Sequence, residues 1–225
     1  MIPIIGFVGE KKSGKTLMLE AVIKVLSKKG RKIGVIKHTR HGFKLDYPET
    51  DSSRLMNSGA RKVVMLGNGQ IGVYGAESPE PSVEQARDLY FPELDLVLVE
   101  GYKDAAVPKV LVALSGKVPA WGKNLPGLIA VVAPKKTALK ASQFKPSQAA
   151  QLAGLVDGYV KLHRGKREVN IYLDGEKLQI KPFIKDFFLN SINGMIGSLS
   201  GAKGAKRIQI SIEIPEGVSV PIPGE

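Results

Sequence analysis

The chain has 225 residues, enough for one sizeable domain or for a medium domain with a small appendage. Hydrophobic residues make up 43% and charged residues 24%, and no apolar run approaches the roughly 18–20 residues that span a bilayer. The lack of cysteine excludes disulfides, thiolate metal sites and cysteine nucleophiles. The first residues lack the basic-then-apolar order of a signal peptide, so we expect no membrane association and a cytoplasmic location.

The formal net charge of +12 suits polyanionic partners such as nucleotides, phosphorylated small molecules or nucleic acid. The basic residues are scattered and are not interleaved with aromatic residues. A solvated basic surface is therefore favoured over nucleic-acid binding. A nucleic-acid-stimulated ATPase stays an alternative, which a strongly salt-dependent affinity for DNA or RNA would reveal.

The first elements form a strand–helix–strand unit. Ile2–Val8 is an apolar run of strand length, and a loop follows at Gly9–Gly14. Apolar residues at helical spacing predict a helix over Lys15–Lys28, and Ile33–Ile36 has the composition of a second buried strand. Two strands joined by such a helix imply a parallel sheet.

The middle of the chain continues this pattern after a long polar loop at His38–Thr50, and loops of that length are usually functional or disordered. Ser82 and Gln85 predict a capping box at the start of a helix. The expected fold is α/β, a P-loop NTPase-type mostly parallel sheet flanked by helices. The expected elements are a helix at Asp51–Ser58, strands at Val63–Leu66 and Ile71–Tyr74, a helix ending near Tyr90, strands at Leu94–Val99, Val110–Leu114 and Leu128–Ala133, and a helix at Pro146–Ala153.

The sequence pattern changes from about Val160, where the alternation of buried strands and helices ends. Glu168–Ile180 alternates around an Asp-Gly pair and predicts an antiparallel hairpin. Phe183–Leu199 follows as an amphipathic helix, and Arg207–Ile214 as a final strand. We therefore predict a P-loop nucleotide-binding domain over residues 1–158 and a small α+β domain (ββαβ) of unknown role over residues 159–225.

The clearest motif is Gly9-Glu10-Lys11-Lys12-Ser13-Gly14-Lys15-Thr16, which matches the phosphate-loop pattern G-x-x-x-x-G-K-[ST] between a strand and a helix. Its glycines let main-chain N–H groups surround a phosphate, and the helix start attracts the anion. Lys15 is expected to reach the terminal phosphates, and the Thr16 hydroxyl to ligate Mg²⁺.

A second acidic residue should complete such a site. Glu100 comes where the buried strand of Leu94–Val99 ends, and the carboxyl ends of parallel strands line the ligand crevice. Asp95 lies near the start of that strand, at the opposite edge. We therefore predict a functional role for Glu100, the alternative being an exposed acid at a strand end.

Lys37 ends the second strand at the same edge and is followed by His38, Thr39, Arg40 and His41. Two histidines at i and i+3 could bind a metal, but no third ligand is obvious. Contact with phosphate or substrate is favoured, and a solvated loop remains the alternative. Asp46 is a candidate Mg²⁺ ligand, while Asp51, another candidate, could instead cap its helix.

Several blocks of residues, in order and spacing, resemble the molybdopterin-guanine dinucleotide biosynthesis protein B (MobB) family. The resemblance covers about residues 1–135. Its blocks beyond the phosphate loop are Lys37-His38-Thr39-Arg40-His41, Asp46, Asp51-Ser52-Ser53-Arg54, Gly59-Ala60, Val99-Glu100-Gly101-Tyr102-Lys103 and Pro108-Lys109.

Members of that family are P-loop proteins that bind GTP, usually as homodimers, and hydrolyse it weakly. They assist the guanylyltransferase that attaches GMP to molybdopterin. The resemblance implies GTP and Mg²⁺ as cofactors, that transferase and a molybdopterin-type substrate as partners, and a homodimer. It implies that residues Gly9 to Thr16 hold the phosphates and that Lys15 and Glu100 are the catalytic residues. It also implies that the metal is held by Thr16, Glu100 and Asp46. The residues that line the crevice would be Lys37, His38, His41, Arg54 and Lys103.

The chain departs from the family pattern in the polar loop. Arg40 stands where a histidine is usual, and Gly42 and Lys44 replace acidic residues. Each change makes the loop more positive, which weakens a metal site there and fits a pterin phosphate better. The charged stretch Glu10-Lys11-Lys12 also replaces mostly small residues.

The residues leave other questions open. The sequence contains neither an N-K-x-D nor a T-K-x-D motif that could read guanine. Base contacts are instead expected from the backbone near Pro134–Thr137. Hydrolysis is expected to be slow, because neither an arginine finger nor a water-orienting glutamine can be assigned. The alternative function is a small-molecule kinase acting on a phosphorylated or pterin-like acceptor, and a phosphoryl-transfer assay would separate it from the accessory role.

Overall fold

The computed structural model describes residues 2–39, 50–75, 80–163, 169–173 and 176–199, together with Ile208, Ile210 and Ile212. The chain divides into two compact units, Met1–Lys166 and Arg167–Glu225. Within the described part, none of the helices combines the length and the apolar character needed to cross a membrane.

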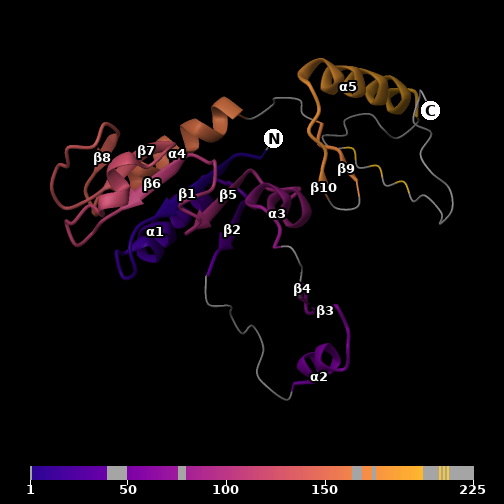
Figure 1. The fold of residues 1–225 in the computed structure, drawn as a ribbon, viewed down its shortest axis with the longest axis horizontal. Helices are drawn as coiled ribbons and strands as arrows, with labels where there is room; N and C mark the ends of the chain where they lie inside the picture. Colours follow the sequence, from indigo (N-terminus) through magenta and orange to yellow (C-terminus); the bar gives the residue numbers. More distant parts are fainter. Residues whose placement is uncertain are drawn as a thin grey trace. The chain divides into compact units, whose positions relative to one another are not determined.

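A six-stranded parallel sheet forms the centre of the first unit, as predicted (Figure 1). The strand order is β2-β5-β1-β6-β7-β8, so β1 lies between neighbours from later in the chain. This order is that of an open α/β sheet, whose ligand crevice lies outside the carboxyl ends of its strands. The strands are β1 (Ile4–Val8), β2 (Ile33–Lys37), β5 (Leu96–Glu100), β6 (Lys109–Val112), β7 (Leu128–Val132) and β8 (Ser142–Phe144).

Helices α1 (Lys15–Lys28) and α4 (Ala149–His163) share one hydrophobic core with the sheet. Met18 and Val22 of α1 and Val156 of α4 pack with alternate strand residues, all nearly inaccessible to water. Helix α3 (Val83–Tyr90) packs with the other strand residues, through Val83. The sheet is therefore covered on both faces, which explains the continuous apolar runs of its strands.

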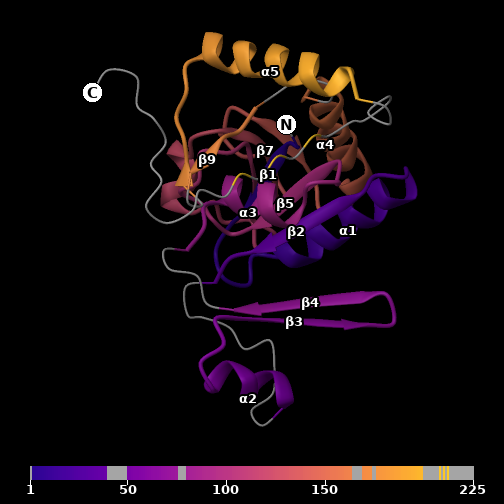
Figure 2. The same cartoon turned by 90° about the vertical axis from the view of Figure 1, so that its right-hand side faces the viewer.

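The segment of residues 50–75, here called the hairpin segment, consists of α2 (Asp51–Asn57) and two antiparallel strands. The strands are β3 (Lys62–Gly67) and β4 (Gln70–Gly75), and Figure 2 shows them as a long two-stranded ribbon. Neither α2 nor the strands contain a fully buried residue.

The second unit contains a short antiparallel pair, β9 (Tyr172–Leu173) and β10 (Glu176–Lys177), followed by α5 (Pro182–Gly197). The predicted hairpin and helix are confirmed, although the strands are shorter than expected. The predicted last strand lies largely outside the described residues, and the three described there carry no strand.

Some details differ from the predictions. Strand β8 was not predicted, because three residues in a polar context carry no period. Helix α4 begins and ends later than predicted and runs to His163, since Val160 is still buried in the core. The whole of α4 belongs to the first compact unit, which ends at Lys166. The capping box of Ser82 and Gln85 is confirmed.

Candidate nucleotide-binding site

The loop between β1 and α1 packs closely against the end of β6 and the residues that follow it. A Cβ atom on Gly9 would lie 2.3 Å from the carbonyl oxygen of Val112, and one on Gly14 would lie 2.3 Å from Cδ1 of Leu114. Gly14 also has φ +88°, which disfavours any side chain. Only glycine therefore fits at both positions. The end of β6 supports the loop, because the Leu114 N–H donates to the Ser13 carbonyl over 3.1 Å.

The Lys15 side chain folds back over this loop. Its ammonium donates to the carbonyl oxygens of Gly9 and Glu10, over 3.0 and 2.6 Å. The buried hydroxyl of Ser13 has no hydrogen-bond partner within the described residues. The loop therefore carries the Lys15 ammonium and the unpaired Ser13 hydroxyl in the same turn. Both groups are of the kind that bind an anion.

Two predicted metal-site residues meet across the sheet. The Thr16 hydroxyl, in the first turn of α1, donates to Glu100 Oε1 over 2.9 Å. Glu100 ends β5, which pairs with β1 in parallel. These residues are 84 positions apart in the sequence, and the pairing of β1 with β5, together with the turn from β1 into α1, brings them together. A hydroxyl and a carboxylate oxygen are the ligand types that Mg²⁺ prefers.

Lys37 lies beside this pair, because the ends of β2 and β5 are paired with Lys37 opposite Glu100. Partial burial lowers the pKa of Lys15 overall; Glu100 raises it, and the Lys37 ammonium lowers it further. The Lys15 ammonium thus has one carboxylate and a second ammonium near it, which leaves positive charge that a bound anion would neutralise.

His38, Tyr102 and Glu80, here called the ring cluster, lie next to Glu100. The His38 N–H donates to the Glu100 carbonyl, and the rings of His38 and Tyr102 have their centroids 4.1 Å apart with a tilt of 42°. The Tyr102 hydroxyl donates to Glu80 Oε1 over 2.9 Å. Glu80 was missed from sequence, because no motif or period links it to a tyrosine 22 positions away.

Lys103 and Lys109 make different kinds of contact. The Lys103 ammonium lies 5.7 Å from the ring centroid of Trp121, in the short helix η1 (Ala120–Asn124). Lys109 is buried, and its ammonium donates to the carbonyl oxygens of Ala105, Val107 and Pro126. Burial lowers the pKa of Lys109. Lys109 therefore ties together the loops that precede β6 and β7.

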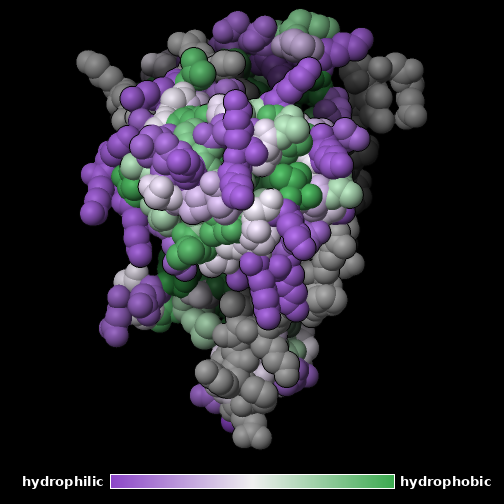
Figure 3. Space-filling view, turned by 90° about the vertical axis from the view of Figure 1, so that its left-hand side faces the viewer, coloured by the Kyte–Doolittle hydropathy of each residue, from purple (hydrophilic) through white to green (hydrophobic). Residues whose placement is uncertain are grey.

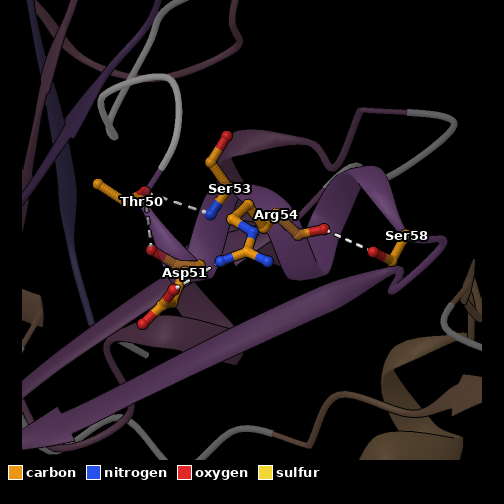
Figure 4. Close-up of polar contacts among 6 residues, drawn as sticks. Thr50, Asp51, Ser53, Arg54 and Ser58 are labelled. Carbon is orange, nitrogen blue, oxygen red and sulfur yellow. Dashed lines mark hydrogen bonds and ion pairs between the residues drawn. The ribbon is translucent and has the colours of Figure 1, made fainter.

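Arg54, predicted to line the crevice, lies on α2, where its guanidinium is 3.5 Å from the Asp51 carboxylate (Figure 4). Its carbonyl accepts from the Ser58 hydroxyl. The N-cap of α2 is Thr50, so Asp51 occupies the first turn and is not the cap. The described contacts of Arg54 are thus those of its own helix.

Three residues of the predicted polar loop, Arg40, His41 and Asp46, lie outside the described residues, and so do Gly42 and Lys44. In the part that is described, no three His, Asp or Glu side chains gather into a group that could hold a metal. Figure 3 shows hydrophilic side chains spread over one face with hydrophobic residues between them, in agreement with the scattered basic residues of the sequence.

A sequence model of the family described as MobB, molybdopterin guanine dinucleotide synthesis protein B, matches residues 4–134. That range is more than half of the chain and contains the phosphate loop, Glu100 and the ring cluster. The chain belongs to the MobB family.

Similar proteins extend this result to the rest of the chain. The chain is 37% identical over 112 residues to the molybdopterin-guanine dinucleotide biosynthesis adapter protein of Haemophilus influenzae, covering 49% of this chain and 62% of that protein. It is 25% identical to a putative adapter protein of the same name in Methanocaldococcus jannaschii, over 94% of this chain and 97% of the relative. The archaeal match therefore includes most of the second unit.

The fold agrees with solved MobB structures. A MobB homolog from Bacillus stearothermophilus superimposes with a TM-score of 0.56 and 26% identity, covering 71% of this chain and 99% of that one. Nearly all of that structure thus has a counterpart in this chain, and the rest of this chain is additional to what that structure contains.

Proposed function

We propose that this protein binds GTP with Mg²⁺ at the phosphate loop and acts as an accessory protein of molybdopterin-guanine dinucleotide formation. It would present the nucleotide to the guanylyltransferase that attaches GMP to molybdopterin, with only weak hydrolysis of its own. The name of the Haemophilus relative, an adapter protein of this biosynthesis, supports the assignment of the pathway.

The contact between Thr16 and Glu100 carries the nucleotide part of the proposal. It joins the first residue after the phosphate-loop lysine to an acid from the neighbouring strand, over 2.9 Å. A turn that served only as a structural connection would not need a hydroxyl, a carboxylate and the Lys15 ammonium at one point.

The residues present fit a magnesium ion. Thr16 and Glu100 supply oxygen ligands, and Mg²⁺ usually completes its octahedron with waters and substrate phosphates. Bound there, the ion would neutralise charge on the terminal phosphates. Lys15 would bind the same phosphates, and the Ser13 hydroxyl and the loop N–H groups would face the anion.

Weak hydrolysis follows from what surrounds the loop. Fast P-loop enzymes owe much of their rate to an arginine finger and a water-orienting glutamine. Among the described residues, no hydrogen bond or ion pair joins the phosphate loop to an arginine or a glutamine. Steady-state turnover of many GTP per second would contradict the accessory role.

Calorimetric titration of GTP and ATP, with and without Mg²⁺, tests the site. Lys15→Ala should weaken triphosphate binding by about 1.5–3 kcal/mol, the range for a hydrogen bond to a charged group. Glu100→Gln should reduce the gain in affinity that Mg²⁺ provides and change metal-free binding less. Lys24→Ala is the matched control, because Lys24 is an exposed lysine of the same helix, about 13 Å further along its axis. Equal binding by wild type and Lys15→Ala would refute the site.

We also propose a homodimer, supported by the hairpin segment. Leu66 and Ile71 are opposite each other across β3 and β4 and are 76% and 73% exposed. An isolated two-stranded hairpin is marginal in water, and exposed apolar patches usually mark interfaces.

Light scattering coupled to gel filtration would then find a dimer that Leu66→Lys dissociates. Leu89→Lys, at an exposed leucine of α3, should leave the dimer intact. Dimers of undiminished stability in Leu66→Lys would exclude the hairpin from the interface.

A further inference from the structure

The carboxyl edge of the sheet has two sides around the phosphate loop. β6, β7 and β8 lie on one side of β1, and β5 and β2 lie on the other. Glu100 and Lys37, which adjoin the Lys15 ammonium, belong to the β5–β2 side. The ring cluster is on this side too, because His38 follows β2 and Tyr102 follows β5. It therefore borders the terminal phosphate and metal end of the proposed nucleotide site.

The main chain at this corner is held in an uncommon conformation. Tyr102 has φ +52° directly after Gly101 at φ +96°. A non-glycine residue in the left-handed region costs roughly 1–2 kcal/mol, and such strain gathers at functional sites. Here it turns the Tyr102 ring toward His38, against the residues packed around Val99. The unfavourable main-chain conformation is thus kept where it brings these two rings together.

Glu80 places a carboxylate beside the two rings. Its side chain is 67% exposed, and Oε1 accepts from the Tyr102 hydroxyl while lying 3.9 Å from His38 Nε2. The hydrogen bond from the Tyr102 hydroxyl holds the Glu80 carboxylate beside the two rings. An acceptor-only group beside a site for polyanions repels phosphate, so it suits a neutral ligand that brings N–H donors.

We propose that the ring cluster binds a planar heterocycle that carries two adjacent N–H donors, the edge of a 2-amino-4-oxopyrimidine ring. The Glu80 carboxylate accepts both N–H groups in a bidentate pair, and the rings of Tyr102 and His38 contact the face of the heterocycle. Guanine and pterins share this edge. The position of the cluster at the terminal-phosphate end favours a second ligand, a pterin, over the nucleotide's own base.

This inference rests on the proposed nucleotide site but can fail independently of it. The probes are pterin and lumazine, two fluorescent bicycles of nearly equal size. Lumazine has a carbonyl where pterin has the 2-amino group, so it lacks the adjacent pair of donors. Titrations use the full chain with GTP and Mg²⁺ present, so that any contact with the terminal phosphate is available.

Wild type should bind pterin about tenfold or more tightly than lumazine, because a charge-assisted hydrogen bond is lost with the latter. Glu80→Gln should remove most of this preference while GTP affinity stays unchanged. Glu93→Gln, at an exposed acid before β5, should behave as wild type. Tyr102→Phe should keep pterin binding but reduce the preference, because the Glu80 carboxylate loses its anchor.

Three outcomes would overturn the inference. One is equal affinity for pterin and lumazine in wild type. A second is a preference that Glu80→Gln does not change, which would leave the cluster a purely structural contact. The third is Glu80→Gln weakening GTP but not ATP, with pterin unaffected, which would assign the cluster to the guanine base. Loss of triphosphate binding in Lys15→Ala tests the nucleotide site in each case.

Discussion

The sheet and the hairpin segment both contain many apolar residues, but most of these residues are buried in the sheet and exposed in the hairpin. Val97 and Leu98 in β5 are fully buried between helix layers, while Leu66 and Ile71 in the hairpin are about three-quarters exposed. The sheet has internal partners for its apolar side chains, and the hairpin does not have them within its own 26 residues. Apolar content alone therefore does not separate the part of the chain that stabilises the fold from the part that offers a surface.

The largest contrast is expected from truncating one apolar side chain in each region. Phe7→Ala should lower the free energy of unfolding by about 3–5 kcal/mol, because Phe7 is fully buried in the core. Leu66→Ala should change it by less than about 0.5 kcal/mol in dilute protein. Urea unfolding measures both, and a cost for Leu66→Ala that rises with protein concentration would point to burial between two copies.

A smaller contrast is expected from two glycines with similar φ. Gly14→Ala combines φ +88° with a Cβ 2.3 Å from Leu114, so overpacking adds about 1–3 kcal/mol to the backbone cost. Gly69, in the hairpin turn, has φ +73° and nothing within 4 Å of a Cβ. Gly69→Ala should therefore cost only the left-handed conformation, about 1–2 kcal/mol. Equal costs for the two variants would mean that Leu114 moves aside freely.

The third contrast concerns two ion pairs. Arg31 Nε donates to Asp157 Oδ1 over 2.7 Å between side chains that are 13% and 9% exposed, whereas Asp51 and Arg54 are 96% and 74% exposed. The hydrogen bond from Arg31, reinforced by Lys161, holds the pKa of Asp157 below its ordinary value. Asp157→Asn should cost about 1.5–3 kcal/mol at pH 7, and Asp51→Asn should have no measurable effect.

The sign of the pH dependence follows from the direction of that shift. Asp157 has a lower pKa folded than unfolded, so its contribution is present above the unfolded pKa of about 3.9 and is lost as the pH falls through the folded pKa. The difference in unfolding free energy between wild type and Asp157→Asn should therefore narrow from pH 5 to pH 3. A difference that stays constant over this range would assign the effect to packing.

Local patterns were sufficient for the phosphate loop, for most strands of the sheet and for the acid at the end of β5. These depend on short-range rules: glycine spacing, apolar runs, and the edge at which parallel strands end. The contact between Glu80 and Tyr102 depends on tertiary packing, which no local pattern encodes. Strand β8 was missed for the same reason, since only its pairing with β7 makes it a strand.

Trp121 is the only tryptophan of the chain, and the ammonium of Lys103 lies 5.7 Å from its ring centroid. Lys103 directly follows the Gly101–Tyr102 turn, so the ammonium beside the indole belongs to the same short segment as Glu100. A ligand that draws Lys103 toward the phosphate loop removes a positive charge from the indole and shifts its emission. If the proposed nucleotide draws Lys103 in this way, stopped-flow fluorescence of Trp121 should follow nucleotide binding without any label.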